Sequence, residues 1–344
     1  MSRRLVVDLQ ARAPVWRLPP WGEDAIRASA PPGWETHVVR APTVSDGDGG
    51  APPAEEALAA IAGAEAYFGF GMSTALLERA DALRWVHSAA AGVGSLLVPA
   101  VRERELLITN SAGIHAVPIA EYVVAGVLYL LRGLDLAAAA QRAHMWGRQA
   151  FVGADSPVRE MGECAALIVG AGGIGSAVAE RLAALGARCT GVRRRPALGV
   201  PPGFARVVGP DAWRDLLGDY NILVIAAPAT NATRALVTGA ELDRLPVGAI
   251  VVNVSRGSLL DAAALVERLH DRRLRGAVLD VFEREPLPPS SPLWDVPSVL
   301  VTPHVSGVSP NGFWRRELDL FTDNWTRYAS GAPLRNVVDQ RAGY

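Results

Sequence analysis

A glycine-rich turn between an apolar strand and a helix constrains the fold of this chain more than any other feature. The run 166–169 is typical of a buried strand, and a helical pattern follows from Ile174 to Leu185. In such a turn, one glycine permits the tight bend, another lets the backbone approach a pyrophosphate, and another packs helix on strand. Amide groups at the helix start then face the phosphates. The pattern predicts a dinucleotide-binding turn formed by Gly170, Ala171, Gly172, Gly173, Ile174 and Gly175.

Apolar segments alternate with helical patterns after this turn. The segments 189–192, 222–225, 249–254 and 277–279 are apolar throughout, as strands are when helices cover both faces of a parallel sheet. Residues 1–116 are a less regular α/β region, and apolar residues from Trp314 to Tyr328 repeat at helical spacing. The sequence therefore predicts an α/β fold with a first domain of residues 1–116, a doubly wound Rossmann domain of residues 117–304, and a return of residues 305–344 to the first domain.

Composition narrows the possible functions. The 344 residues are 50% hydrophobic, with a formal net charge of −1 and two cysteines. A near-neutral charge gives no reason to expect nucleic acid or a membrane surface as a partner. No signal-peptide pattern is seen at the start, and the longest apolar stretch, 117–131, is short for a bilayer. Two cysteines provide neither a disulfide framework nor a metal site. We expect a cytoplasmic protein without a metal.

The basic residues are all arginine, 34 in number. Schiff-base chemistry, phosphate-loop NTPase chemistry and Tyr-x-x-x-Lys reductase chemistry each need a lysine ammonium. The absence of lysine therefore disfavours short-chain reductases and lysine-dependent β-hydroxyacid dehydrogenases.

The end of the second Rossmann strand indicates which dinucleotide binds. NAD-binding sites usually place an acidic residue there, about 20 residues beyond the turn, on the ribose 2′-hydroxyl. This chain has Arg193, Arg194 and Arg195 instead. A guanidinium can bind a 2′-phosphate bidentately, whereas a carboxylate would repel it. We predict that NADP(H) is preferred and NAD(H) is possible, with Arg193 and Arg194 at the cofactor; the alternative is a group of solvated surface arginines.

Polar side chains follow three later strands. Arg256 follows one predicted strand, Glu285 follows the strand that carries Asp280, and His304 follows the apolar segment 299–301. Ligands of such sheets bind at the carboxyl ends of the strands. An imidazole can protonate a developing alkoxide, a bonded carboxylate fixes its tautomer, and a guanidinium matches a carboxylate or keto oxygen. A lone histidine is more often structural, but the three together predict hydride transfer to a small keto acid.

The segment from Val169 to His304 resembles the D-isomer-specific 2-hydroxyacid dehydrogenases, a family that includes glyoxylate/hydroxypyruvate reductases and phosphoglycerate dehydrogenases. The resemblance extends over about residues 60 to 339, and the first 55 residues match only loosely. The motifs that carry it are the glycine turn, Asn253-Val-Ser-Arg-Gly257, Leu279-Asp-Val-Phe-Glu-Arg-Glu-Pro-Leu287 and Thr302-Pro-His-Val-Ser-Gly307.

The resemblance implies roles for individual residues. Arg256 would orient the substrate, His304 would be the acid/base and Glu285 its partner. Backbone amides of the loop Ala90-Ala91-Gly92-Val93 would bind the substrate carboxylate. The cofactor cleft would be lined by Ala227, Pro228, Val254, Ser255, Asp280 and His304, with Asp280 near the nicotinamide carboxamide.

The resemblance also implies a flavodoxin-like first domain completed by the C-terminal helix. It implies a homodimer built on the cofactor domain, in which a partner chain buries the apolar run from Val117. His115 and Trp146 are plausible pocket residues, although packing is the more frequent role of such side chains.

The function that these features predict is NADPH-dependent reduction of a small 2-keto acid, such as glyoxylate or hydroxypyruvate, to the D-2-hydroxy acid. Phosphite oxidation on the same scaffold is an alternative, whereas formate oxidation is disfavoured because that subfamily carries an amide where Glu285 stands. A non-enzymatic NAD(P)H-sensing scaffold like the corepressors of this fold is the other alternative, and the complete Arg-Glu-His set argues against it.

Overall fold

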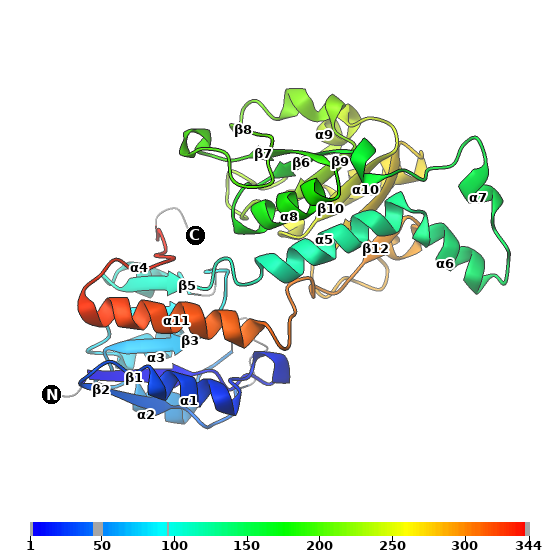
Figure 1. The fold of residues 1–344 in the computed structure, drawn as a ribbon. Helices are drawn as coiled ribbons and strands as arrows, with labels where there is room; N and C mark the ends of the chain where they lie inside the picture. The colour runs from blue at the N-terminus through cyan, green and yellow to red at the C-terminus, as the bar shows by residue number, and fades with distance from the viewer. Residues whose placement is uncertain (1–2, 44–50, 95, 341–344) are drawn as a thin grey trace. The chain divides into compact units, whose positions relative to one another are not determined.

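The computed structural model describes residues 3–43, 51–94 and 96–340, which form two compact units (Figure 1). The first unit joins residues 1–115 to residues 308–344, and the second consists of residues 116–307. The chain therefore leaves the first unit once and returns to it with the C-terminal segment.

The first unit is built on a parallel sheet. Within the described residues it has five strands in the order β2-β1-β3-β4-β5. This is the flavodoxin-like order, which confirms the fold predicted for the first domain. The strands are β1 (Arg3–Asp8), β2 (Trp34–Val38), β3 (Ala66–Gly69), β4 (Trp85–Ser88) and β5 (Leu107–Asn110).

Helices cover both faces of this first sheet. One face packs against α1 and the C-terminal helix α11, where the rings of Phe68 and Phe321 stack with centroids 4.0 Å apart. The other face packs against α2, α3 and α4. The C-terminal helix thus completes the first unit, as predicted. The helices are α1 (Pro20–Ala28), α2 (Glu55–Ala60), α3 (Thr74–Arg79), α4 (Pro99–Arg102) and α11 (Phe313–Ser330).

A buried polar chain ties α11 to the sheet. Glu317 of α11 and His87 of β4 are both fully buried, with 3.2 Å between Oε1 of Glu317 and Nε2 of His87. Nδ1 of His87 lies 2.7 Å from Oγ1 of Thr109 on β5, which also accepts a hydrogen bond from Trp85. Removing one member would leave another buried polar group without its partner, so this chain should stabilise the first unit.

The second unit is built on a larger parallel sheet. Within the described residues it has seven strands in the order β12-β11-β10-β9-β6-β7-β8. This is the Rossmann order, in which the winding direction changes between β6 and β9, and it confirms the predicted fold class. The strands are β6 (Ala165–Val169), β7 (Arg188–Val192), β8 (Arg206–Val208), β9 (Ile222–Ile225), β10 (Ala249–Asn253), β11 (Leu274–Leu279) and β12 (Val299–Val301).

Helices of the second unit cover both faces of its sheet. Helices α5 and α8 cover one face, and α9 and α10 cover the other. Val123, Val127 and Leu130 of α5 are completely buried by their own unit. This core explains much of the apolar character of α5, whereas Val117 itself is 38% exposed, so burial of the run by a partner chain stays a prediction. The helices are α5 (Ala116–Leu131), α6 (Leu134–Arg142), α7 (Gln149–Val152), α8 (Gly173–Ala184), α9 (Gly239–Arg244) and α10 (Ala262–His270).

The segment that contains α6 and α7 carries exposed apolar side chains. Trp146 is 94% exposed, so the packing role expected for it is wrong within this chain. His115 does pack, because its ring stacks on Phe313 with centroids 5.5 Å apart.

Among the described helices, none alone is long and apolar enough to cross a membrane. Helices α5 and α6 together reach that length and apolar character, but only as a pair bent by 68°.

We expect Glu317→Ala to lower the free energy of unfolding by about 3 kcal/mol or more, because it removes one member of a buried pair. Asp319→Ala is the matched control, because Asp319 lies on the same helix and is exposed. Urea unfolding of both variants measures the difference. Equal stabilities of the two variants would contradict a stabilising role for the buried pair.

Candidate active site

The glycine turn lies where the winding of the second sheet changes direction. Gly170 has a φ of +114°, and a Cβ there would lie 2.5 Å from the carbonyl carbon of Ala226, which follows β9. A Cβ on Gly175 would lie 1.9 Å from the oxygen of Gly170. A Cβ on Gly172 would meet no atom within 4 Å, so the backbone there is open to approach. Gly173 and Ile174 then begin α8.

Hydrogen bonds join the glycine turn to the end of β7. The N–H groups of Gly170 and Ala171 both donate to the carbonyl oxygen of Val192, at 3.0 and 2.9 Å. Arg193 is the next residue and is half-buried, with Nη1 donating to the oxygen of Gly199 at 3.3 Å. Arg194 and Arg195 are exposed. The structure thus places the first arginine of the run beside the turn.

The ends of β9 and β10 meet at the same edge of the sheet. Oγ of the buried Ser255 donates to the carbonyl oxygen of Ala227, and the N–H of Val254 donates to Ile225. The exposed Pro228 follows Ala227, and its carbonyl oxygen accepts a hydrogen bond from Thr233. This edge therefore offers backbone and small side chains next to the turn, which suits an extended ligand.

Glu285 and His304 form a hydrogen-bonded pair. Oε2 of Glu285 lies 2.8 Å from Nδ1 of His304, and Oε1 accepts the N–H of Phe282 at 2.9 Å. The two side chains are 36% and 47% exposed. No described residue hydrogen-bonds to Nε2 of His304. With the carboxylate accepting from Nδ1–H, Nε2 becomes the ring atom that can exchange a proton with a ligand.

Asp280 holds the loop that carries His304. The side chain is fully buried, and it accepts hydrogen bonds from Oγ1 of Thr302 and from the N–H groups of Val305 and Ser306, the last two at 2.8 and 2.9 Å. The backbone of His304 has a φ of 55°, in the left-handed region. Both carboxylate oxygens thus face donors of this loop, a structural role that the sequence did not reveal, and the expected position of Asp280 near the nicotinamide stays a prediction.

Tyr122 of α5 extends this network. Its hydroxyl lies 2.7 Å from Oγ1 of Thr302, which in turn donates to Asp280. Burial raises the pKa of Tyr122 to about 12, so the phenol stays neutral at physiological pH. The hydrogen bond between Tyr122 and Thr302 spans 180 residues of sequence, and the one between Thr302 and Asp280 spans 22. For this reason no local sequence pattern could reveal them.

Arg256 is presented by a turn that Asn253 organises. The side chain of Asn253 donates to the oxygen of Arg256 at 3.0 Å and accepts the N–H of Ser255 at 3.1 Å. Arg256 is exposed, and its Nη1 donates to the oxygen of Ser255 at 2.7 Å. A Cβ on Gly257 would lie 1.8 Å from the carbonyl carbon of Phe282, so this turn packs directly on the segment that leads to Glu285. No hydrogen bond or ion pair joins Arg256 to Glu285 or His304 among the described residues.

The loop 90–93 belongs to the first unit. The carbonyl oxygen of Ala91 accepts a hydrogen bond from the side chain of Asn110 at 2.7 Å, and the side chain of Val93 lies in the core. Within the part of the chain that the structure describes, the N–H groups of Ala91, Gly92 and Val93 have no acceptor. These N–H groups are left as donors, and the role in binding a substrate carboxylate that the resemblance implies for them stays a prediction.

The donor set at the edge of the second sheet fits a dinucleotide. The open backbone at Gly172, the start of α8 and the arginine at the end of β7 are groups that bind phosphates. In the described ranges, no group of three or more His, Cys, Asp or Glu side chains could hold a metal ion.

The sequence matches known proteins over most of its length. Residues 124–306 match the family model of the D-isomer specific 2-hydroxyacid dehydrogenase NAD-binding domain. An (S)-sulfolactate dehydrogenase from Chromohalobacter salexigens is 33% identical over 68% of this chain and 74% of its own. A glyoxylate/hydroxypyruvate reductase A from Salmonella typhimurium is 34% identical over 65% of this chain and 68% of its own.

Solved structures match the whole chain. A D-isomer specific 2-hydroxyacid dehydrogenase from Xanthobacter autotrophicus, in complex with NADPH and MES, has a TM-score of 0.80 and 29% identity and covers 100% of both chains. An NADPH-dependent glyoxylate/hydroxypyruvate reductase from Sinorhizobium meliloti, in complex with NADP and sulfate, has a TM-score of 0.78 and 28% identity, with the same coverage. These matches confirm the resemblance carried by the motifs, and the chain belongs to the D-isomer-specific 2-hydroxyacid dehydrogenases.

Proposed function

We propose that this protein reduces a small 2-keto acid of the glyoxylate or hydroxypyruvate type to the D-2-hydroxy acid with NADPH. The observation that carries the proposal is the Glu285–His304 pair, which lies at the same sheet edge as the glycine turn. In this assignment the second unit binds the cofactor and the first contributes a substrate-binding loop.

His304 would supply the proton. When bound, the reduced nicotinamide supplies the hydride that the keto carbon accepts. As negative charge develops on the keto oxygen, the imidazole donates its proton from Nε2, and Glu285 at Nδ1 stabilises the charged ring. The loop fixed by Asp280 keeps the ring oriented for this transfer.

Arg256 and the loop 91–93 would hold the substrate. A guanidinium can donate two parallel hydrogen bonds to a carboxylate or to the carboxylate and keto oxygens of a 2-keto acid. The N–H groups of Ala91, Gly92 and Val93 would provide neutral donors for a substrate carboxylate. Such positioning lowers the entropic part of the barrier to hydride transfer.

NADP(H) is the proposed cofactor, with NAD(H) as a weaker substitute. The support is Arg193 at the end of β7, tied to the glycine turn through Val192. The relatives from Xanthobacter autotrophicus and Sinorhizobium meliloti were solved with NADPH and NADP. Asp280, Ala227, Pro228, Val254 and Ser255 would border the nicotinamide end.

The protein is proposed to form a homodimer through the α6–α7 segment. The segment exposes Leu134, Met145, Trp146 and Val152, which are between 49% and 94% exposed. A set of large apolar side chains on one surface segment favours an interface.

We expect Trp146→Ser to shift the mass measured by light scattering from dimer towards monomer, while Trp21→Ser on the exposed side of α1 leaves it unchanged. A wild-type monomer at micromolar concentration would contradict the dimer.

We expect His304→Gln to lower kcat for glyoxylate reduction by about 100-fold or more, because the proton donor is lost. The dissociation constant for NADPH, measured by fluorescence titration, should change by no more than about threefold, because proton transfer plays no part in cofactor binding. His270→Gln, at the exposed end of α10, is the control. An unchanged kcat in His304→Gln would refute the assignment.

We expect Arg193→Asp to lower the ratio of kcat/KM for NADPH to kcat/KM for NADH by about tenfold or more, because a carboxylate repels the 2′-phosphate. Arg188→Asp lies at the opposite end of the same strand and should keep the wild-type ratio. If both variants keep that ratio, Arg193 does not select the cofactor.

A further inference from the structure

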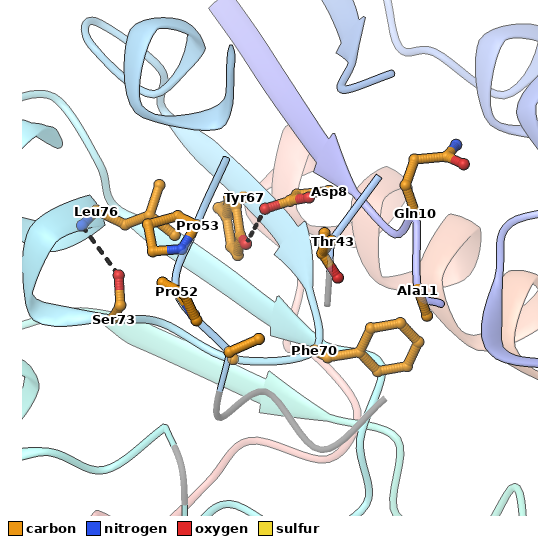
Figure 2. Close-up of a pocket in the computed structure, with 12 residues that line it drawn as sticks. Asp8, Gln10, Ala11, Thr43, Pro52, Pro53, Tyr67, Phe70, Ser73 and Leu76 are labelled. Atoms are coloured by element: carbon orange, nitrogen blue, oxygen red, sulfur yellow. Dashed lines mark hydrogen bonds between the residues drawn. The ribbon is translucent and has the colours of Figure 1, made fainter. Parts of the chain in front are cut away.

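A polar pocket lies at the carboxyl-terminal edge of the first sheet (Figure 2). Its cavity volume of about 40 Å³ can hold roughly three water-sized groups. It could therefore receive a hydroxymethyl group or a group of similar size. The described residues that line it are Asp8, Gln10, Ala11, Thr43, Ala51, Pro52, Pro53, Tyr67, Phe70, Gly71, Ser73 and Leu76.

Asp8 is the charged group of this pocket. It ends β1 and is only 7% exposed. The hydroxyl of Tyr67 donates to its Oδ2 at 3.0 Å, as Figure 2 shows, whereas Oδ1 is buried and has no partner among the described residues. An unpartnered buried carboxylate oxygen is costly and favours a ligand that donates a hydrogen bond.

Gly69 allows Tyr67 to reach Asp8. A Cβ on Gly69 would lie 2.5 Å from the hydroxyl oxygen of Tyr67, so a side chain at this position would displace the phenol. Burial raises the pKa of Tyr67 well above its ordinary value, and the phenol therefore stays a donor. The local sequence thus holds Asp8 in one orientation.

The pocket favours neutral or cationic groups over anions. None of its described lining residues is arginine or histidine, although the chain has 34 arginines. Burial raises the pKa of Asp8, and the nearby charge of Glu56 raises it further, while the hydrogen bond from Tyr67 opposes this change. A second anion placed here would meet these carboxylates with no cation to compensate it.

The pocket adjoins the loop assigned to the substrate carboxylate. Asp8, Gly69 and Ser88 are paired across β1, β3 and β4, so the backbones of Asp8 and Ser88 are about 10 Å apart. Oγ of Ser88 donates to the oxygen of Phe70, which lines the pocket, and accepts the N–H of Ala90. One serine thus joins the rim of the pocket to the start of the loop.

The other side of the loop is filled by the chain itself. The side chain of Asn110, at the end of β5, donates to the oxygen of Ala91 at 2.7 Å. The side chain of Asn336 donates in turn to the oxygens of Asn110 and Ala112, at 3.2 and 2.8 Å. The pocket lies on the side of this loop towards β1, and for this reason we assign the side chain of a substrate held by the loop to the Asp8 pocket.

We propose that the Asp8 pocket binds the side chain of the 2-keto acid. It accepts a hydrogen bond from a donor such as a hydroxyl group and disfavours a second anionic group. The inference rests on the proposed function. Asp8 acts as the specificity-determining acceptor, and Tyr67 positions it.

The wild-type protein provides the first test, with NADPH and matched substrates. Hydroxypyruvate and 2-ketobutyrate differ by a hydroxyl in place of a methyl group, and oxaloacetate carries a second carboxylate. We expect kcat/KM for hydroxypyruvate to exceed the values for 2-ketobutyrate and oxaloacetate by about tenfold or more, because only hydroxypyruvate can donate to Asp8. Glyoxylate has no side chain, and its reduction by the wild type tests the proposed function alone.

Asp8→Asn provides the second test, because it preserves shape and removes charge. We expect the ratio of kcat/KM for hydroxypyruvate to kcat/KM for oxaloacetate to fall by about tenfold or more, whereas Asp24→Asn on exposed α1 keeps the wild-type ratio. A ratio measured within one variant does not depend on how much of that variant is active. Should Asp8→Asn fail to fold, the wild-type comparison decides.

The outcomes separate the two claims. No glyoxylate reduction by the wild type overturns the proposed function, and this inference falls with it. Glyoxylate reduction with equal kcat/KM for hydroxypyruvate and oxaloacetate overturns the inference alone. A folded Asp8→Asn variant that keeps the wild-type ratio of kcat/KM for hydroxypyruvate to kcat/KM for oxaloacetate also overturns the inference alone.

Discussion

The buried carboxylate of Asp280 fixes the loop on which the proposed chemistry depends. It accepts hydrogen bonds from residues on both sides of His304, at Thr302, Val305 and Ser306. These bonds hold His304 in a left-handed conformation, which is unfavourable by about 1–2 kcal/mol for an L-residue. With the backbone fixed, one ring nitrogen faces Glu285 and the other is left for a ligand. A site held in this way is preorganised before any ligand binds.

Much of the second unit could be predicted from the sequence, because its signals are local. The glycine turn, the apolar strands and their intervening helices each follow from patterns within a few residues, and the strand-end positions of Arg256, Glu285 and His304 follow from them. The strands β2 and β8 lie at sheet edges and are only partly buried. Their sequences therefore lack the continuous apolar runs by which buried strands can be predicted.

Long-range contacts explain what the sequence did not reveal. The resemblance placed Asp280 near the cofactor, which stays a prediction, but it gave no sign that this carboxylate also accepts hydrogen bonds from residues 22 to 26 positions away. The pairing of Asp8 with Tyr67 spans 59 residues and depends on a glycine that has no recognisable motif. Trp146 was expected to pack because large aromatic residues usually do, yet it lies on a segment that projects its apolar side chains outward.

The most direct measurement of the central claim is the product formed from 2-ketobutyrate and NADPH by the purified protein, resolved by chiral chromatography. We expect D-2-hydroxybutyrate, because the chain belongs to the D-isomer-specific dehydrogenases, with one NADPH oxidised for each product molecule. Formation of the L-isomer, or product without matching NADPH oxidation, would contradict the account.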